Sequence, residues 1–78
     1  MTYQERIRGL REDNDFTQKQ IADLLGIAQT TYSQYELVKR PLPIDYLIFL
    51  CKFYKVSADY ILGFTDERSS TGGVKYKR

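Results

Sequence analysis

With 78 residues, the chain has room for one small domain, and its apolar share of 42% and charged share of 28% are typical of a folded protein. A single cysteine, Cys51, excludes an internal disulfide bond, and no apolar run reaches the roughly 18 residues that a membrane-spanning helix requires. The net charge of +2 arises after residue 63, because residues 1–63 hold equal numbers of basic and acidic side chains. This balance excludes binding to a polyanion by bulk positive charge alone. The polar first residues show no secretion signal, so we expect a cytoplasmic protein.

The first predicted element is an amphipathic helix over residues 3–13. Tyr3, Ile7 and Leu10 recur at the spacing of one helix face, and Asn14 follows as a helix-ending residue. We therefore expect one side of this helix to face the core.

The second predicted helix has a clear start and a clear end. Thr17 and Gln20 form the spacing of a capping box, in which each side chain satisfies a free backbone N–H of the first turn. Gly26 suits the left-handed position that ends a helix. Its buried face is supplied by Ile21, Leu24 and Leu25.

The third predicted helix, over residues 28–36, has one apolar face and one polar face. Tyr32 and Tyr35 lie three residues apart and are expected to point inward. The outward face is predicted to consist of four neutral hydrogen-bonding side chains, Gln29, Thr30, Ser33 and Gln34. Such a face is poorly suited to catalysis and well suited to hydrogen bonding with the edges of DNA bases.

The remainder of the chain predicts a loop, two more helices and a tail. Residues 37–43 contain two prolines and are predicted to form a loop, followed by a mostly apolar helix over residues 44–54. Ser57 and Gly63 bracket a short fifth helix. We place the folded domain at residues 1–65 and a flexible, basic C-terminal tail at residues 66–78.

Two of these helices predict a helix-turn-helix over residues 17–36 that contacts double-stranded DNA. An α-helix fits the major groove, where glutamine forms a bidentate pair with adenine and serine or threonine adds single contacts. Gln18, at the first turn of the second helix, is placed to meet a phosphate, and so are Lys39 and Arg40 in the following loop.

The chain resembles the phage repressor/Cro helix-turn-helix family, the lambda-repressor-like or XRE-type domains, over about residues 3–65. The resemblance depends on the following pairs taken together: Leu10-Arg11, Thr17-Gln18, Ile21-Ala22, Leu25-Gly26, Tyr35-Glu36, Lys39-Arg40, Val56-Ser57 and Leu62-Gly63. It implies an all-α, compact five-helix bundle, a repressor-type activity and operator DNA as the ligand. It further implies a phosphate contact for Gln18 and base contacts for the matching positions Gln29, Thr30 and Gln34. It also implies a buried structural salt bridge between Arg11 and Glu36.

Three positions depart from the pattern of this family. Val38 stands where the family often has glycine, so we expect the loop to follow another path. Ala28 replaces the usual Ser or Thr cap, at a cost of roughly 1 kcal/mol. Thr30 is shorter than glutamine or arginine and reaches only a thymine methyl group or a water.

The leading hypothesis is a sequence-specific transcriptional regulator, a repressor, that binds a pseudo-palindromic operator as a homodimer. The alternative is a protein-interaction module, such as an antitoxin or adaptor, that binds a protein partner through helices four and five, with Tyr46 and Tyr60 on the contact surface. An enzyme is not expected, because the chain has no histidine, no glycine-rich phosphate loop and no metal-ligand spacing. We expect no cofactor and no metal.

Overall fold

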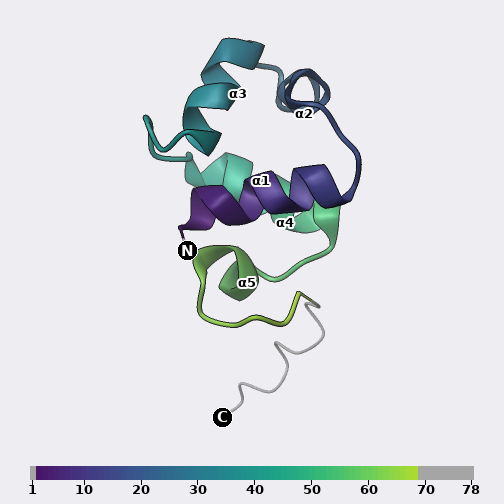
Figure 1. Cartoon of the computed structure of the whole chain (residues 1–78), viewed down its shortest axis with the longest axis vertical. Coiled ribbons are helices and arrows are strands. Elements are labelled where there is room, and N and C mark those ends of the chain that lie inside the picture. Colours follow the sequence, from purple (N-terminus) through teal and green to yellow (C-terminus); the bar gives the residue numbers. More distant parts are fainter. Residues whose placement is uncertain (1, 69–78) are drawn as a thin grey trace.

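The computed structural model describes residues 2–68, which fold into five α-helices joined by short loops (Figure 1). The helices are α1 (Tyr3–Asp13), α2 (Gln18–Leu25), α3 (Gln29–Glu36), α4 (Ile44–Tyr54) and α5 (Ala58–Leu62). The predicted all-α five-helix architecture is thus confirmed. None of the helices in this range is long and apolar enough to cross a membrane.

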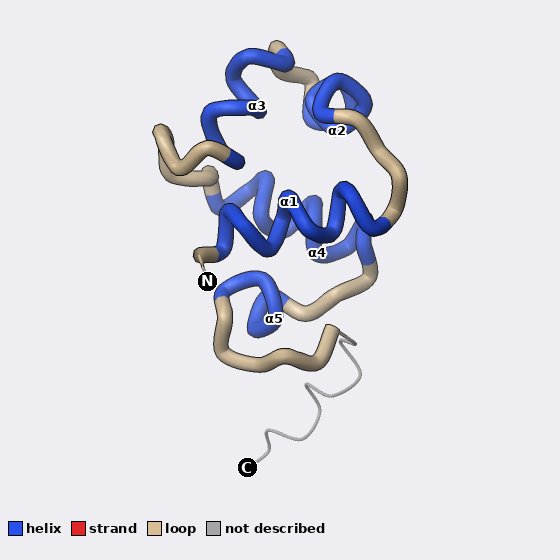
Figure 2. Tube along the Cα trace, viewed as in Figure 1, coloured by secondary structure: helices blue, strands red, loops and turns tan. Residues whose placement is uncertain are grey.

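The helices are arranged around α1, which crosses the middle of the molecule with α4 behind it in this view (Figure 2). The pair α2 and α3 lies on one side of α1, and α5 lies on the other. All five helices, together with Val56 of the α4–α5 loop, contribute to one core, in which Ile7, Ile21 and Ile61 are fully buried. Burial of each such side chain contributes about 1.5–3 kcal/mol. The fold therefore presents α2 and α3 together at one end of the molecule.

Helix starts follow the capping chemistry of the sequence. The Thr17 side chain accepts a hydrogen bond from the backbone N–H of Gln20, and the Gln20 side chain accepts one from the backbone N–H of Thr17, which confirms the predicted capping box. Thr2 and Glu5 form a second capping box at α1. Ala28, the residue before α3, provides no side-chain cap.

All five helices end in the same way, with a residue in the left-handed conformation just after the last turn. In each case the next residue donates its backbone N–H to the carbonyl five positions earlier, as in a Schellman motif. The left-handed positions are Asp15, Gly26, Val38, Lys55 and Gly63, with φ values of 62°, 73°, 62°, 59° and 90°. Only two of the five are glycine. The sequence signals at Gly26 and Gly63 were sufficient to place those ends.

The segment after α5 differs from the expected flexible tail. Residues 66–68 return to α1, where Asp66 pairs with Arg6 at 2.9 Å and Arg68 pairs with Asp13 at 2.6 Å. The guanidinium groups of both arginines also lie against the Tyr60 ring, with centroid distances of 4.4 and 5.4 Å. Residues 66–68 thus contact α1 and Tyr60, and the domain boundary at residue 65 stays a prediction. Residues 69–78 lie outside the described range.

Candidate nucleic-acid interface

The four polar side chains predicted to read DNA lie on the outer face of α3. At about 100° per residue, Tyr32, Tyr35 and Glu36 gather on one side of the helix, and all three are buried. Of the four polar side chains, Gln29 and Thr30 are exposed, whereas Ser33 and Gln34 are half-buried. Within the described part of the chain, none of the four side chains hydrogen-bonds to another residue. Their donors and acceptors are free for a ligand.

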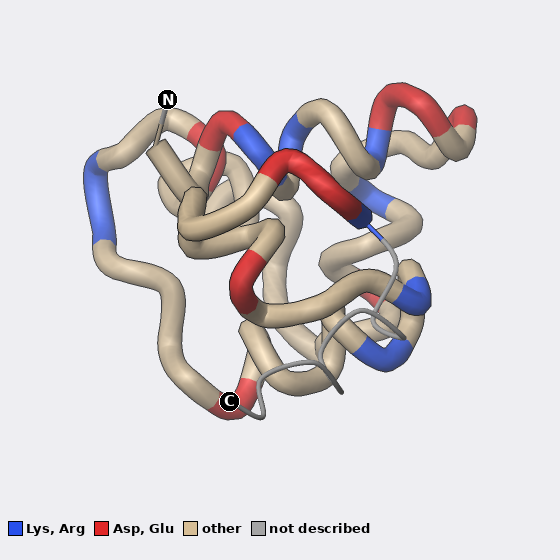
Figure 3. The backbone as a smooth tube through the Cα atoms, turned by 90° about the horizontal axis from the view of Figure 1, so that it is seen from below, with Lys and Arg blue, Asp and Glu red and all other residues tan. Residues whose placement is uncertain are grey.

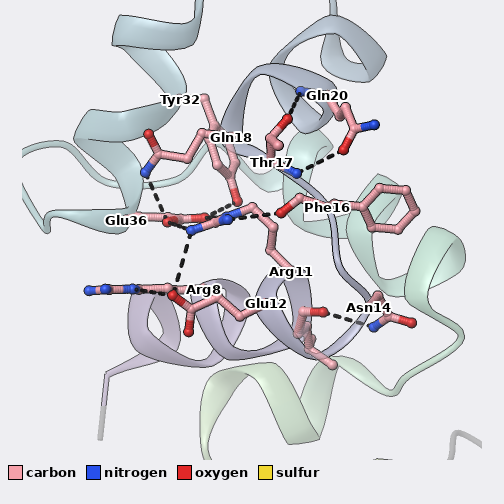
Figure 4. Close-up of polar contacts among 11 residues, drawn as sticks. Arg8, Arg11, Glu12, Asn14, Phe16, Thr17, Gln18, Gln20, Tyr32 and Glu36 are labelled. Carbon is pink, nitrogen blue, oxygen red and sulfur yellow. Dashed lines mark hydrogen bonds and ion pairs between the residues drawn. The ribbon is translucent and has the colours of Figure 1, made fainter.

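The inner face of α3 is fixed by Glu36, whose side chain is only 2% exposed (Figure 4). Arg11 of α1 donates to both carboxylate oxygens, from Nε at 2.7 Å and from Nη2 at 3.0 Å. The Tyr32 hydroxyl donates at 2.6 Å, and the Gln18 amide of α2 donates at 3.1 Å. The carboxylate therefore joins α1, α2 and α3 through four hydrogen bonds.

Hydrogen bonding keeps this buried carboxylate ionised. Burial is the largest single influence on the pKa of Glu36 and opposes ionisation. The hydrogen bonds from Arg11, Tyr32 and Gln18 together outweigh it, so the pKa lies below its ordinary value. The hydrogen bond to Glu36 likewise raises the pKa of Arg11. Because both partners stay charged and are largely buried, removal of either would leave a buried charge without this partner.

Gln18 occupies the expected place at the first turn of α2, and its amide is already in use. The side chain is half-buried, and Nε2 donates one hydrogen to Glu36. A glutamine amide has a second hydrogen on the same nitrogen. This second hydrogen is the group that Gln18 can offer to a phosphate without giving up Glu36.

The loop after α3 carries the two predicted phosphate-binding cations. Lys39 and Arg40 are exposed, and their loop projects at the left edge of the view in Figure 3. Valine at position 38 is compatible with the left-handed turn. Val38 takes the left-handed conformation that glycine adopts freely, and Lys39 closes the turn by donating to the Gln34 carbonyl at 2.9 Å. The strain of a non-glycine residue in this conformation costs roughly 1–2 kcal/mol.

Comparison with known proteins supports the interpretation of this geometry. A family model for the helix-turn-helix, HTH_3, matches residues 7–61, which is more than half of the chain. The chain belongs to the HTH_3 helix-turn-helix family. It is 43% identical over 65 residues to the HTH-type transcriptional regulator YobD of Bacillus subtilis (strain 168), covering 83% of this chain and 58% of YobD. It is 36% identical over 63 residues to the HTH-type transcriptional regulator ImmR of the same organism, covering 81% of this chain and 50% of ImmR. The chain thus spans about half the length of these curated relatives.

A solved structure of the P22 c2 repressor protein in complex with synthetic operator 9T has a similar fold. The TM-score is 0.70 at 27% sequence identity, and the match covers 80% of this chain and 94% of the repressor chain. The phage repressor resemblance of the sequence is confirmed by the family and by this fold.

Several residues that support the HTH_3 interface were not predicted from the sequence. The Thr2–Glu5 capping box has the same spacing as Thr17–Gln20 and could have been recognised by that spacing. Tyr32 and Gln18 both donate hydrogen bonds to Glu36. The contact of Gln18 had no local signal in the sequence, because Gln18 lies 18 positions from Glu36. Tyr60, which only the alternative hypothesis placed on a protein-binding surface, is buried, and the guanidinium groups of Arg6 and Arg68 lie against its ring.

Proposed function

We propose that this chain is a sequence-specific DNA-binding transcriptional regulator that acts as a repressor by occupying an operator. The observation that carries the proposal is the outer face of α3, where four uncharged hydrogen-bonding side chains are available while Glu36 fixes the opposite face. The names of YobD and ImmR as transcriptional regulators, and the operator bound by the P22 c2 repressor, support the same function.

In the proposed complex α3 lies in the major groove. Gln29 and Gln34 pair with adenine through their amide groups, and Thr30 and Ser33 contribute single hydrogen bonds or a methyl contact with thymine. Each bidentate pair contributes about 1–3 kcal/mol of discrimination against a wrong base. Because Glu36 holds α3 against α1 and α2, these side chains meet the groove in one fixed orientation.

The DNA backbone is held on either side of α3. The free amide hydrogen of Gln18 and the positive end of α2 face one phosphate, and Lys39 and Arg40 face others. These contacts set the register on the duplex and contribute affinity that depends on salt and little on sequence.

We further propose that the chain binds as a homodimer to a pseudo-palindromic operator in the cytoplasm, with half-sites about one helical turn apart. An exposed apolar surface on α4 supports a contact with another protein chain. Ile44 and Ile48 lie one turn apart on α4 and are 64% and 47% exposed. The same surface supports part of the alternative function, in which α4 and α5 bind a different protein, as an antitoxin or adaptor does.

Selection of bound duplexes from a random pool, at two salt concentrations, tests the proposal directly. We expect one enriched consensus for the parent protein. Gln29→Ala and Gln34→Ala should each relax preference at one position by about 1–3 kcal/mol. A parent protein that enriches no duplex but captures a protein partner would favour the alternative.

The predicted phosphate contacts are tested by the salt dependence of binding. Lys39→Ala and Arg40→Ala should weaken binding to all duplexes alike and reduce the slope of log affinity against log salt by about 1 each. Lys52→Ala removes an exposed lysine from α4 and serves as the matched control, for which the slope should not change. An equal change of slope in all three variants would contradict the assignment.

A further inference from the structure

The outer face of α3 continues beyond Gln34 into an exposed leucine. Leu37 lies one turn after Ser33 and two turns after Thr30, and its N–H donates to the Ser33 carbonyl at 3.0 Å. Its φ of −85° and ψ of 5° keep it close to the helical path. Leu37 is 55% exposed and does not belong to the core. The polar face therefore ends in an apolar group that points with it.

Val38 extends this apolar end at the cost of backbone strain. It is a β-branched residue in the left-handed conformation, with φ of 62°, and it is 54% exposed. Glycine would complete the same turn without strain. Because the core makes no use of the valine side chain, packing within the described fold does not account for its presence.

The neighbouring charges indicate what covers this apolar pair. Lys39 and Arg40 follow it directly, and both are exposed. A surface that runs from neutral hydrogen-bonding groups through two apolar side chains to two cations matches the edge of a DNA groove. There, base edges, thymine methyl groups, deoxyribose carbons and phosphates follow one another.

We propose that Leu37 and Val38 contact the operator duplex through its apolar groups, at the C-terminal end of α3. The proposal rests on the proposed function, since it extends the same interface. In this proposal both residues contribute to binding affinity. A residue that contacts a thymine methyl group also contributes a preference for thymine at that position.

The test uses the duplex enriched by the parent protein and compares two variants with two controls. Leu37→Ala should weaken binding about four- to tenfold, as expected for loss of a half-exposed leucine that becomes covered. Val38→Gly should raise Tm by about 4–8 °C, because strain is relieved, and yet weaken binding about two- to fivefold. Lys55→Gly relieves the same strain at the end of α4, where φ is 59°, and should raise Tm without weakening binding. Leu62→Ala removes a leucine of similar exposure (43%) from α5 and should bind as the parent does.

The results distinguish a contact with DNA from a contact between two copies of the chain. If the parent protein enriches a duplex and the Leu37 and Val38 variants bind it as tightly as the parent, the apolar contact is refuted and the proposed function stands. If the parent enriches no duplex, both fail. Loss of dimerisation by Leu37→Ala in sedimentation without DNA would assign the surface to a second copy of the chain and overturn the contact. Replacement of thymine by uracil in the duplex distinguishes the two supporting cases. A methyl contact makes the parent more sensitive to uracil than Leu37→Ala, whereas a deoxyribose contact leaves the two proteins equally sensitive.

Discussion

Replacement of Glu36 by alanine should destabilise the protein by about 3–5 kcal/mol. The side chain is almost fully buried and accepts four hydrogen bonds, from Arg11, Tyr32 and Gln18. Its removal leaves the Arg11 guanidinium, whose side chain is only 12% exposed, with no buried partner and with only the longer, exposed pair to Glu12 at 3.9 Å. A domain of this length has a free energy of unfolding of roughly 4–12 kcal/mol, so the loss consumes much of the total.

Urea denaturation followed by circular dichroism at low temperature measures this loss. Asp23→Asn is the matched control, because it removes a carboxylate from the exposed pair with Lys19, whose N–O distance is 3.3 Å. Exposed pairs contribute about 0.2–1 kcal/mol, so this variant should unfold almost as the parent does. A loss below about 1 kcal/mol for Glu36→Ala would refute the reasoning that the buried carboxylate holds α3 in place.

The same carboxylate gives the stability a defined dependence on pH. The pKa of Glu36 is lower in the folded protein than its ordinary value of 4.5. Its contribution is therefore fully present above pH 4.5 and is lost as the pH falls toward and through the folded pKa. In Glu36→Gln this part of the acid destabilisation should be absent, and unfolding free energies measured between about pH 3 and pH 6 should fall less steeply than in the parent. Identical slopes in parent and variant would show that another carboxylate dominates acid unfolding.

Three further outcomes follow from the caps and the returning C-terminal segment. Thr17→Ala should lower the free energy of unfolding by about 0.5–2 kcal/mol in thermal or urea melts, because a backbone N–H of α2 loses its acceptor; an unchanged melt would contradict the role of the cap. Ala28→Ser should raise stability by about 0.5–1 kcal/mol by the same measurement, since α3 starts without a side-chain cap; the absence of any gain would show that a cap is not what this helix start lacks. Asp13→Ala should accelerate trypsin cleavage after Arg68 severalfold, as followed by mass spectrometry, because it frees a guanidinium held at 2.6 Å; an equal cleavage rate would show that the pair does not protect this site.

The helices themselves could be predicted from sequence because their signals are local. A capping box spans three positions, and the apolar periodicity of α1 repeats within one or two turns. The division of α3 into an inner face with Tyr32 and Tyr35 and an outer polar face depends on the same short spacing, so the structure reproduces it.

The partners of Glu36 depend on tertiary structure. The resemblance to phage repressors implied Arg11 as its partner, and the structure adds the Tyr32 hydroxyl and the Gln18 amide. Gln18 was expected to face a phosphate. No local pattern could reveal that the start of α2 and the end of α3 meet at one carboxylate, because this depends on how α2 packs against α3.

The returning segment and the turn at Val38 show the same limit. Asp66 pairs with Arg6, which lies 60 positions earlier in the chain. Because no local pattern indicates so distant a contact, the composition of the segment after α5 resembled that of a tail. Position 38 is valine and not glycine, the usual sequence signal for a left-handed residue. Val38 nevertheless adopts that conformation, and the hydrogen bond from the Lys39 N–H to the Gln34 carbonyl closes the turn. Sequence by itself determined the helices, their caps and the polar face of α3, since these depend on neighbours within one or two turns. Only the tertiary structure decided which distant groups hold that face in position, because those contacts form when separate helices pack together.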